Sequence, residues 1–121
     1  AALSASNFGL DNVCGIIDLN GIQNDEWVEK EKSIQPLAEK WKAFNWNVLE
    51  INGHVLEEIL SALEKARKTK GKPTLIIAKT VKGKGVSFME LNHKFHGKAP
   101  NDEEYKKAID EIEKIDVKRF K

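Results

Sequence analysis

Cysteine, methionine and proline are scarce in this sequence, which has one, one and three of them among 121 residues. The single cysteine, Cys14, excludes an internal disulfide, and we expect a buried thiol in a reducing compartment rather than a catalytic group. Long apolar runs are also missing, since none approaches the roughly 20 residues that a membrane-spanning helix needs. A basic segment followed by an apolar one, as in a secretory signal, is absent. These absences favour a cytoplasmic protein.

An excess of charge of either sign is missing too. The 20 basic and 19 acidic side chains leave a formal net charge of +1. This balance gives no electrostatic reason to expect nucleic acid or an anionic membrane as a partner. What is present is a globular composition, with 40% hydrophobic and 32% charged residues. The length suits a single domain over residues 1–121.

Apolar runs and amphipathic stripes alternate along the chain. Short apolar runs closed by turn residues predict strands at 13–17, 46–51 and 74–78, the first of them buried on both faces. Apolar residues at three- and four-residue spacing predict helices over 34–44 and 55–66, the former with a proline in its first turn. Strands joined by helices pair in parallel, so the sequence predicts a three-layer α/β/α fold.

Ligands of such sheets bind at the carboxyl ends of the strands. The loops after Asp18, Ile51 and Ala78 therefore form the expected functional edge. Residues 79–100 are a long segment with glycines and no periodicity, which is typical of functional or disordered loops. A final helix begins near Asn101, which has capping-box spacing to Glu104. Its predicted apolar face consists of Tyr105, Ala108, Ile109 and Ile112.

A polar turn follows the first predicted strand. The side-chain oxygen of Asn20 and a nearby backbone carbonyl are hard ligands of the kind that Mg²⁺ or Ca²⁺ prefers. Asn20-Gly21 is also a common turn pair because both residues tolerate positive φ. Taken alone, the pair favours a plain turn.

The segment after the third strand holds the other candidate groups. Lys82-Gly83-Lys84-Gly85 offers glycine amides and two lysines to a phosphate, but it lacks the Walker spacing and also suits a solvated loop. His93 and His96 can donate to phosphate oxygens or exchange protons, although they also suit ordinary loop positions. Trp27, in a polar stretch, is suited to cover a partner or a domain face.

Four landmarks occur in a fixed order along the chain, separated by the expected strands and helices. In this order the chain resembles the transketolase family over essentially its whole length, particularly the form encoded as a separate N-terminal subunit. The resemblance is to the later part of the thiamine-diphosphate-binding domain. The landmarks are Leu10-Asp11-Asn12-Val13 into Ile16-Ile17-Asp18, Asn20-Gly21-Ile22-Gln23, Lys79-Thr80-Val81-Lys82-Gly83-Lys84-Gly85, and His96-Gly97-Lys98-Ala99-Pro100 with Asp102-Glu103-Glu104.

The resemblance implies thiamine diphosphate and Mg²⁺ as cofactors. It implies Asn20, by its side chain, and Ile22, by its carbonyl, as metal ligands, with Gly21 beside them in the cofactor site. Lys82 stands near the cofactor, where many full-length transketolases have a branched apolar residue and the split-subunit branch has lysine. His96, rather than His93, is implied as the catalytic histidine that contacts the diphosphate near the reacting carbon.

The implied activity is transfer of a two-carbon ketol unit between sugar phosphates, in the cytoplasm and in the pentose phosphate pathway. The family's Gly-Asp-Gly element does not occur in these 121 residues, and neither does the pyrimidine-binding domain or C-terminal subunit that completes the site. The chain starts at Ala1, with residues that suit a helix already under way. We therefore expect a truncated thiamine-diphosphate-binding fold, an inactive fragment or piece of a longer chain.

Two further expectations follow from the missing strand. An exposed sheet edge invites homo-oligomerisation or domain swapping. Without cofactor, the segment 79–100 is expected to be disordered or to take an altered path. Two other interpretations stay open: a non-catalytic α/β module that binds a phosphorylated ligand through Lys82–Gly85, and an interaction domain that meets a protein through Trp27 and the long loop.

Overall fold

Two compact units make up the chain in the computed structural model, which describes residues 1–24 and 26–115. The first unit consists of Ala1–Leu19 and Ile34–Lys79. The second consists of Asn20–Ser33 and the chain from Thr80 onward. Every residue predicted to bind the cofactor or the metal belongs to the second unit.

The three predicted strands form one parallel sheet in the first unit. They are β1 (Cys14–Leu19), β4 (Asn47–Asn52) and β5 (Thr74–Lys79), in the order β1-β5-β4. Ala78 of β5 lies opposite both Asp18 of β1 and Ile51 of β4. The carboxyl ends of all three strands therefore meet at one edge, as predicted, and this edge is where α/β proteins bind ligands.

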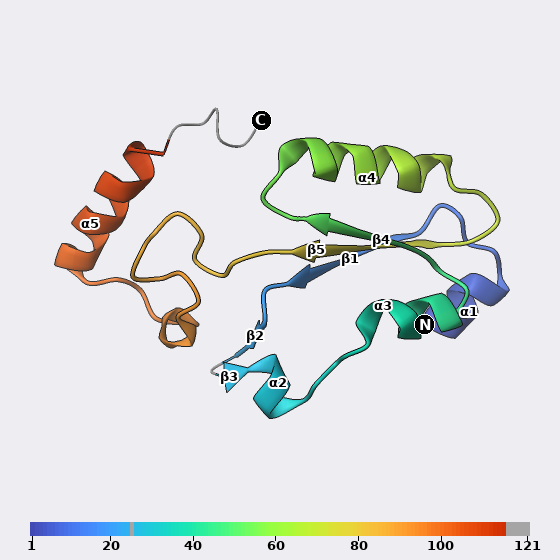
Figure 1. Cartoon of the computed structure of the whole chain (residues 1–121), viewed down its shortest axis with the longest axis horizontal. Coiled ribbons are helices and arrows are strands. Elements are labelled where there is room, and N and C mark those ends of the chain that lie inside the picture. Colours follow the sequence, from blue (N-terminus) through green and yellow to red (C-terminus); the bar gives the residue numbers. More distant parts are fainter. Residues whose placement is uncertain (25, 116–121) are drawn as a thin grey trace. The chain divides into compact units, whose positions relative to one another are not determined.

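Helices cover the two faces of this sheet, which confirms the predicted three-layer arrangement. Helix α4 (Leu56–Lys68) lies on one face, while α1 (Ala2–Asn7) and α3 (Leu37–Ala43) lie on the other (Figure 1). Ala62 and Ala66 are the buried residues of α4, and their small side chains let the helix approach the sheet closely. The core on the opposite face consists of Ala5, Leu37, Trp46, Leu75 and Ile77.

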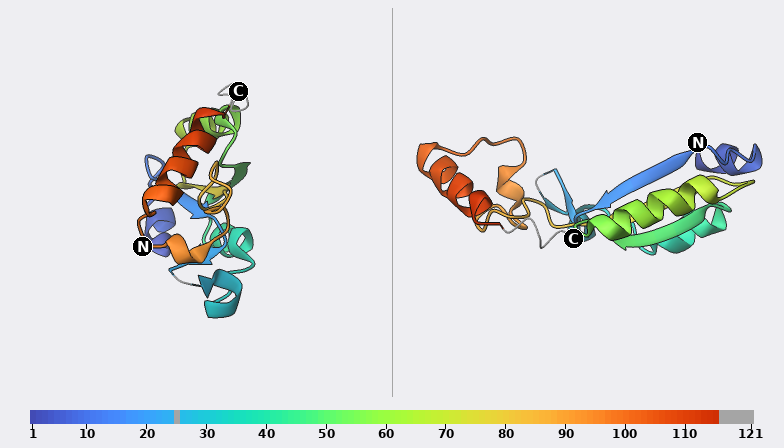
Figure 2. Two further views of the ribbon diagram at one scale, coloured as in Figure 1. Left: turned by 90° about the vertical axis from the view of Figure 1, so that its left-hand side faces the viewer. Right: turned by 90° about the horizontal axis from the view of Figure 1, so that it is seen from above.

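The strand that is buried on both faces is β5, whereas the sequence predicted β1. Leu75, Ile76 and Ile77 of β5 are each at most 2% exposed, whereas Ile16 of β1 is 62% exposed. Helix α4 packs along β4 and β5 and leaves one face of β1 open (Figure 2). The prediction of a buried Cys14 is wrong for the same reason: its thiol is free and exposed. Partial desolvation still raises the pKa of this thiol.

The helix predicted over 34–44 is shorter than its apolar stripe. Helix α3 begins at Leu37, and Pro36 is the N-cap residue rather than part of the first turn. Ile34 still packs against the core, but from the segment that leads into the helix. The periodicity identified core residues correctly and overestimated how many of them are helical.

The second unit begins with a small hairpin where the sequence predicted only a polar stretch. Strand β2 (Ile22–Gln23) pairs antiparallel with β3 (Glu26–Trp27), and α2 (Val28–Glu31) follows directly. Ile22 lies opposite Trp27 in this pairing. The hairpin therefore fixes the backbone on the far side of the Asn20 turn.

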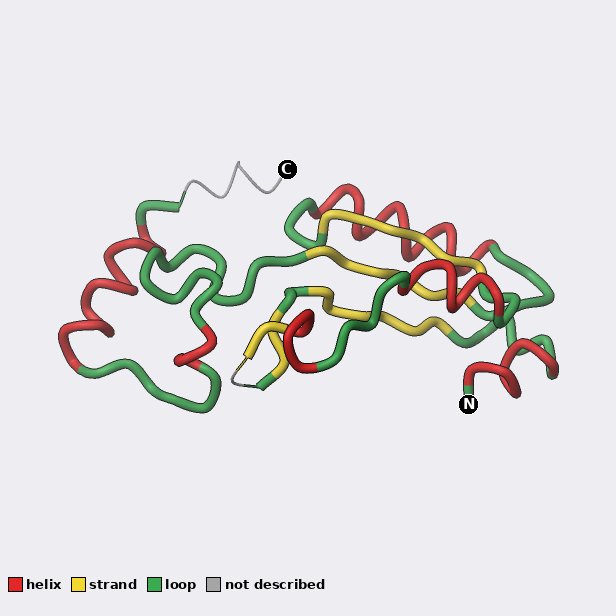
Figure 3. The backbone as a smooth tube through the Cα atoms, turned by 60° about the horizontal axis from the view of Figure 1, so that its bottom comes forward, coloured by secondary structure: helices red, strands yellow, loops and turns green. Residues whose placement is uncertain are grey.

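The rest of the second unit is a run of turns followed by one helix. Between residues 80 and 100 the only regular element is a single 3-10 turn, η1 (His93–Phe95), within a path that the structure describes throughout (Figure 3). Helix α5 (Asp102–Glu113) has the predicted capping box. Asn101 Oδ1 accepts from the Glu104 amide at 2.9 Å, and Glu104 Oε2 accepts from the Asn101 amide at 2.9 Å.

The apolar face predicted for α5 is only partly covered. Ala108 is buried, while Tyr105, Ile109 and Ile112 are exposed. In the described part of the chain, no helix combines the length and the apolar character needed to cross a membrane.

Candidate functional site

The turn at the carboxyl end of β1 brings three of the predicted site residues together. Asn20 Oδ1 accepts a hydrogen bond from the Ile22 amide at 2.9 Å, so the side chain closes an Asx turn over Gly21. The Gly21 carbonyl accepts from the Val28 amide at 3.0 Å, which ties the turn to the start of α2. Asn20 and Gly21 therefore do form a turn, as their pairing in the sequence indicated. The same bond orients the amide oxygen, an atom type that has two lone pairs.

Glycine is required at the centre of this turn. Gly21 has φ of +77°, a conformation that L side chains rarely adopt. A Cβ there would lie 3.8 Å from the Trp27 ring, which is ordinary contact. Backbone conformation, rather than lack of space, therefore explains the residue. Trp27 itself is half-buried and paired across the hairpin, so it supports the turn from within the unit.

The segment that carries Lys82 closes on itself. The Lys82 carbonyl accepts from the Leu91 amide at 3.0 Å. Gly83 has φ of +75°, and a Cβ there would lie 2.5 Å from the Met89 carbonyl oxygen. Such a contact is too short for any side chain. Only glycine therefore lets the backbone at residue 83 approach the backbone at residue 89 this closely. Residues 82–91 are thereby a folded loop rather than an open one.

Several amides of this loop are engaged internally. The amides of Lys84 and Val86 donate to carbonyls within the loop, at 3.2 Å each. The Gly85 amide donates to Glu90 Oε1 at 3.0 Å, and the Lys84 ammonium lies 3.3 Å from the same oxygen. Glu90 thus occupies the donors that an anion would use. Two of the four amides of Lys82–Gly85 are thus already used, which weakens the case for a module that binds phosphate through this backbone.

The two lysines of the loop therefore differ. Lys84 is paired with Glu90, whereas Lys82 forms no ion pair with any carboxylate of the described residues. Lys82 is half-buried and keeps its charge available for an external anion.

The two histidines also differ. His96 is exposed, and its amide donates to the His93 carbonyl at 2.9 Å as η1 ends. His93 is half-buried, and its charge helps to lower the pKa of Glu26, although the Trp27 amide that donates to this carboxylate has the larger effect. His93 therefore lies within electrostatic range of Glu26 in the hairpin that follows Asn20.

The predicted site residues all belong to the second unit. Neither Lys82 nor His96 makes a hydrogen bond or ion pair to the Asn20 turn within the described ranges. In the same ranges no three His, Cys, Asp or Glu side chains gather closely enough to hold a metal ion.

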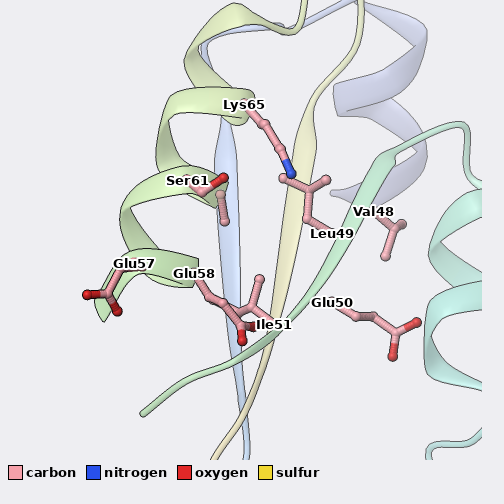
Figure 4. Close-up of a pocket in the computed structure, with 9 residues that line it drawn as sticks. Val48, Leu49, Glu50, Ile51, Glu57, Glu58, Ser61 and Lys65 are labelled. Carbon is pink, nitrogen blue, oxygen red and sulfur yellow. The ribbon is translucent and has the colours of Figure 1, made fainter. Parts of the chain in front are cut away.

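Each unit also has a surface cavity that the sequence did not indicate. In the second unit, a cavity of about 400 Å³ lies between the loop and α5. Its lining residues are Phe88, Asn92, Phe95, Glu103, Glu104 and Lys107. In the first unit, a cavity of about 390 Å³ lies between β4 and α4 (Figure 4). Its carboxylates are largely engaged, since Glu58 accepts from the Asn52 amide and Glu50 pairs with Lys79.

Sequence patterns also missed a contact that joins the loop to α5. Ser87 donates from both its amide and its hydroxyl to the carboxylate of Glu111. The two residues are 24 positions apart, and Ser87 lies in a segment without periodicity. No local pattern could pair them.

A parallel sheet with a polar turn at its carboxyl edge is the arrangement of α/β proteins that bind phosphorylated cofactors. A family model described as "Transketolase, thiamine diphosphate binding domain" matches residues 1–118. The chain belongs to this family, which confirms the resemblance seen in the sequence. The match spans both units and all of the predicted site residues.

Individual relatives agree with this assignment. A 6-deoxy-6-sulfo-D-fructose transketolase subunit from Clostridium sp. (strain MSTE9) is 40% identical over 114 residues, covering 94% of this chain and 42% of the relative. An apulose-4-phosphate transketolase subunit from Phocaeicola vulgatus is 39% identical over 112 residues, covering 93% and 40%. The crystal structure of transketolase from Campylobacter jejuni superposes with a TM-score of 0.83 at 39% identity, covering 93% of this chain and 17% of that chain. The chain thus spans less than half of each of these proteins.

Proposed function

We propose that this chain supplies one half of the cofactor site of a transketolase. The observation that carries the proposal is the family match over residues 1–118, which includes the Asn20 turn at the carboxyl edge of the sheet. The other half, with the Gly-Asp-Gly element and the pyrimidine-binding domain, would come from outside these 121 residues. The two subunit relatives support a partner of this kind.

Asn20 and Ile22 are the proposed Mg²⁺ ligands. The donor set fits the metal in kind, since both groups are uncharged oxygens of the type that Mg²⁺ accepts. The hydrogen bond from the Ile22 amide restrains the Asn20 side chain in the turn. Two ligands are fewer than the six of an octahedral site, and diphosphate oxygens, water and the missing aspartate would supply the rest.

Lys82 and His96 are the proposed contacts to the diphosphate and the reacting centre. When bound, thiamine diphosphate supplies the nucleophilic carbon that takes a two-carbon unit from a ketose and passes it to an aldose. Lys82 contributes a positive charge with no competing carboxylate among the described residues. His96 contributes an exposed imidazole that can donate to a phosphate oxygen or move a proton near neutral pH. We propose sugar phosphates as the substrates.

The chain on its own is not expected to act as an enzyme. Because the Gly-Asp-Gly aspartate and the pyrimidine-binding domain are both outside these residues, the 121-residue chain should bind the cofactor weakly and transfer no ketol unit. Detectable ketol transfer by the purified chain without a partner would contradict this part.

Calorimetry with thiamine diphosphate, with and without Mg²⁺, tests the proposal. Binding should require Mg²⁺, and Asn20→Ala, Lys82→Ala and His96→Ala should each weaken it. Lys84→Ala is the matched control for Lys82, because Lys84 is already paired with Glu90. His54→Ala, in the first unit, is the control for His96. Absence of heat under every condition, or equal losses in the controls, would remove the support for a retained half-site.

A further inference from the structure

His96 follows a single helical turn in a segment without other regular structure. Asn92 Oδ1 accepts from the Lys94 amide at 3.1 Å and so caps this turn. The His96 amide donates to the His93 carbonyl at 2.9 Å. These bonds span at most three residues along the chain. They set the shape of the turn, and contacts from elsewhere must set its place in the unit.

Phe88 provides the first such contact. Its ring lies against the ring of Phe95, with the centroids 5.5 Å apart and the planes tilted by 59°. Contacts of this geometry stabilise aromatic pairs beyond the area that they bury. The Asn92 side-chain amide also donates to the Phe88 carbonyl at 3.0 Å. The turn before His96 is therefore attached to Phe88 through a ring and through a hydrogen bond.

Phe88 is in turn held to α5. The preceding residue, Ser87, donates from its amide to one oxygen of Glu111 and from its hydroxyl to the other, the latter at 2.7 Å. Hydrogen bonds to an ionised carboxylate are stronger than neutral ones, and two of them fix orientation as well as distance. Lys107, one turn before Glu111 on α5, has its ammonium 5.3 Å from the Phe88 ring centroid.

One carboxylate joins both of these attachments. Lys107 lies 3.8 Å from Glu111 Oε1, so Glu111 holds the lysine that lies over Phe88 as well as the serine beside it. Removal of this carboxylate would release Ser87 and Lys107 together. The loop would then lose its polar attachment to α5 at the residue on which the His96 turn rests.

We propose that Glu111 is a positioning residue for His96, acting through Ser87, Phe88 and Phe95. This inference rests on the proposed function, in which His96 meets the cofactor. The proposal gives Glu111 no contact with the cofactor or the substrate. Its part is to keep the imidazole in one place on the second unit, so that cofactor binding need not order the loop.

Hydrogen exchange and NMR of the 121-residue chain without cofactor test this directly. Glu111→Ala should accelerate exchange of the amides in residues 93–97 at least fivefold, because the loss of even one of its two hydrogen bonds to Ser87 would give a change of about this size. The His96 ring Cε1–H resonance should shift, while that of His54 should not. Glu111→Gln keeps one acceptor and one donor for Ser87, so it should largely restore both readouts.

Two further variants separate positioning from general destabilisation. Ser87→Ala removes only the hydroxyl bond and should give a smaller effect of the same kind. Glu113→Ala changes a neighbouring exposed carboxylate of the same helix and should change neither readout. The inference is overturned if Glu111→Ala leaves residues 93–97 and the His96 resonance unchanged, or if Glu113→Ala loosens them equally.

These measurements need no cofactor. Their result therefore tests the role of Glu111 whether or not the chain binds thiamine diphosphate. Lack of thiamine diphosphate binding by the parent chain would count against the half-site and leave the attachment of His96 intact. Where the parent chain binds, Glu111→Ala should weaken binding in parallel with the loss of protection, and Glu111→Gln should restore it. Unchanged binding in Glu111→Ala would overturn the positioning role.

Discussion

The indole nitrogen of Trp46 donates a hydrogen bond to the carbonyl of Ala2 at 2.9 Å, across 44 positions of sequence. Trp46 is 7% exposed, and its ring meets that of Trp41 edge-on with the centroids 4.8 Å apart. The bond thus joins α1 to the start of β4, inside the core under the sheet. One side chain therefore links both helices of that face to the strand.

Trp46→Phe should lower the free energy of unfolding by about 1 kcal/mol, because the partly buried Ala2 carbonyl loses its partner while most of the ring contact stays. Urea unfolding followed by circular dichroism would measure the change. Trp27→Phe is the matched control, since its indole N–H makes no hydrogen bond within residues 1–24 and 26–115. An equal loss in both variants would show that ring size, and not the bond to Ala2, matters.

Gly83→Ala should open the folded loop of residues 82–91. The new Cβ would lie 2.5 Å from the Met89 carbonyl oxygen, so the backbone must move. Exchange of the Leu91 amide, which donates to the Lys82 carbonyl, should accelerate at least tenfold as the loop opens. Gly97→Ala is the control: it has the same φ of +75°, with nothing within 4 Å of the added Cβ. Its strain should not reach Leu91, and equal acceleration there would contradict the closed loop.

The contact between Ser87 and Glu111 should depend on pH. The two hydrogen bonds from Ser87 lower the pKa of Glu111 below its usual value of 4.5, with Lys107 adding a smaller effect and Asp110 opposing it. A lowered pKa in the folded state means that the contribution is fully present above the unfolded value and is lost as pH falls through the folded value. The Ser87 amide resonance, followed from pH 7 to pH 2, should therefore move with a midpoint below 4.5.

Glu111→Gln provides the test of that assignment. Its neutral side chain does not titrate, so the Ser87 resonance should stay flat over the same range. A midpoint at or above 4.5 in the parent chain, or the same transition in Glu111→Gln, would assign the pH dependence to another group.

Self-association should occur through β1. This strand is at one edge of the sheet of the first unit, and Ile16 and Cys14 on it are exposed. Its six residues contain neither lysine nor proline, the usual protections of an edge. A second copy could continue the sheet there. Sedimentation equilibrium should show a dimer at high concentration, which Ile16→Lys weakens through charge repulsion.

Ile112→Lys is the matched control for that experiment. Ile112 is another exposed isoleucine, 48% exposed, but it belongs to α5 and not to a sheet edge. It should leave the association unchanged. A strictly monomeric parent chain, or equal loss in both variants, would contradict association through β1.

The sequence predicted those features that neighbouring residues control. Apolar runs located the three strands to within about two residues, and helices between them required parallel pairing. The capping box at Asn101 and Glu104 was predictable because both partners lie within one turn of chain. The Asn20 turn was recognisable for the same reason. The order of four such landmarks also identified the family.

Only the tertiary structure decided exposure and long-range pairing. Cys14 and Ile16 looked like core residues because their own run is apolar, yet whether a strand is covered depends on where α4 packs. Ser87 and Glu111 carry no shared pattern, since a loop without periodicity does not indicate which helix it will meet. Local chemistry fixes what each segment can become, and packing between distant segments fixes which side chains are buried and which meet.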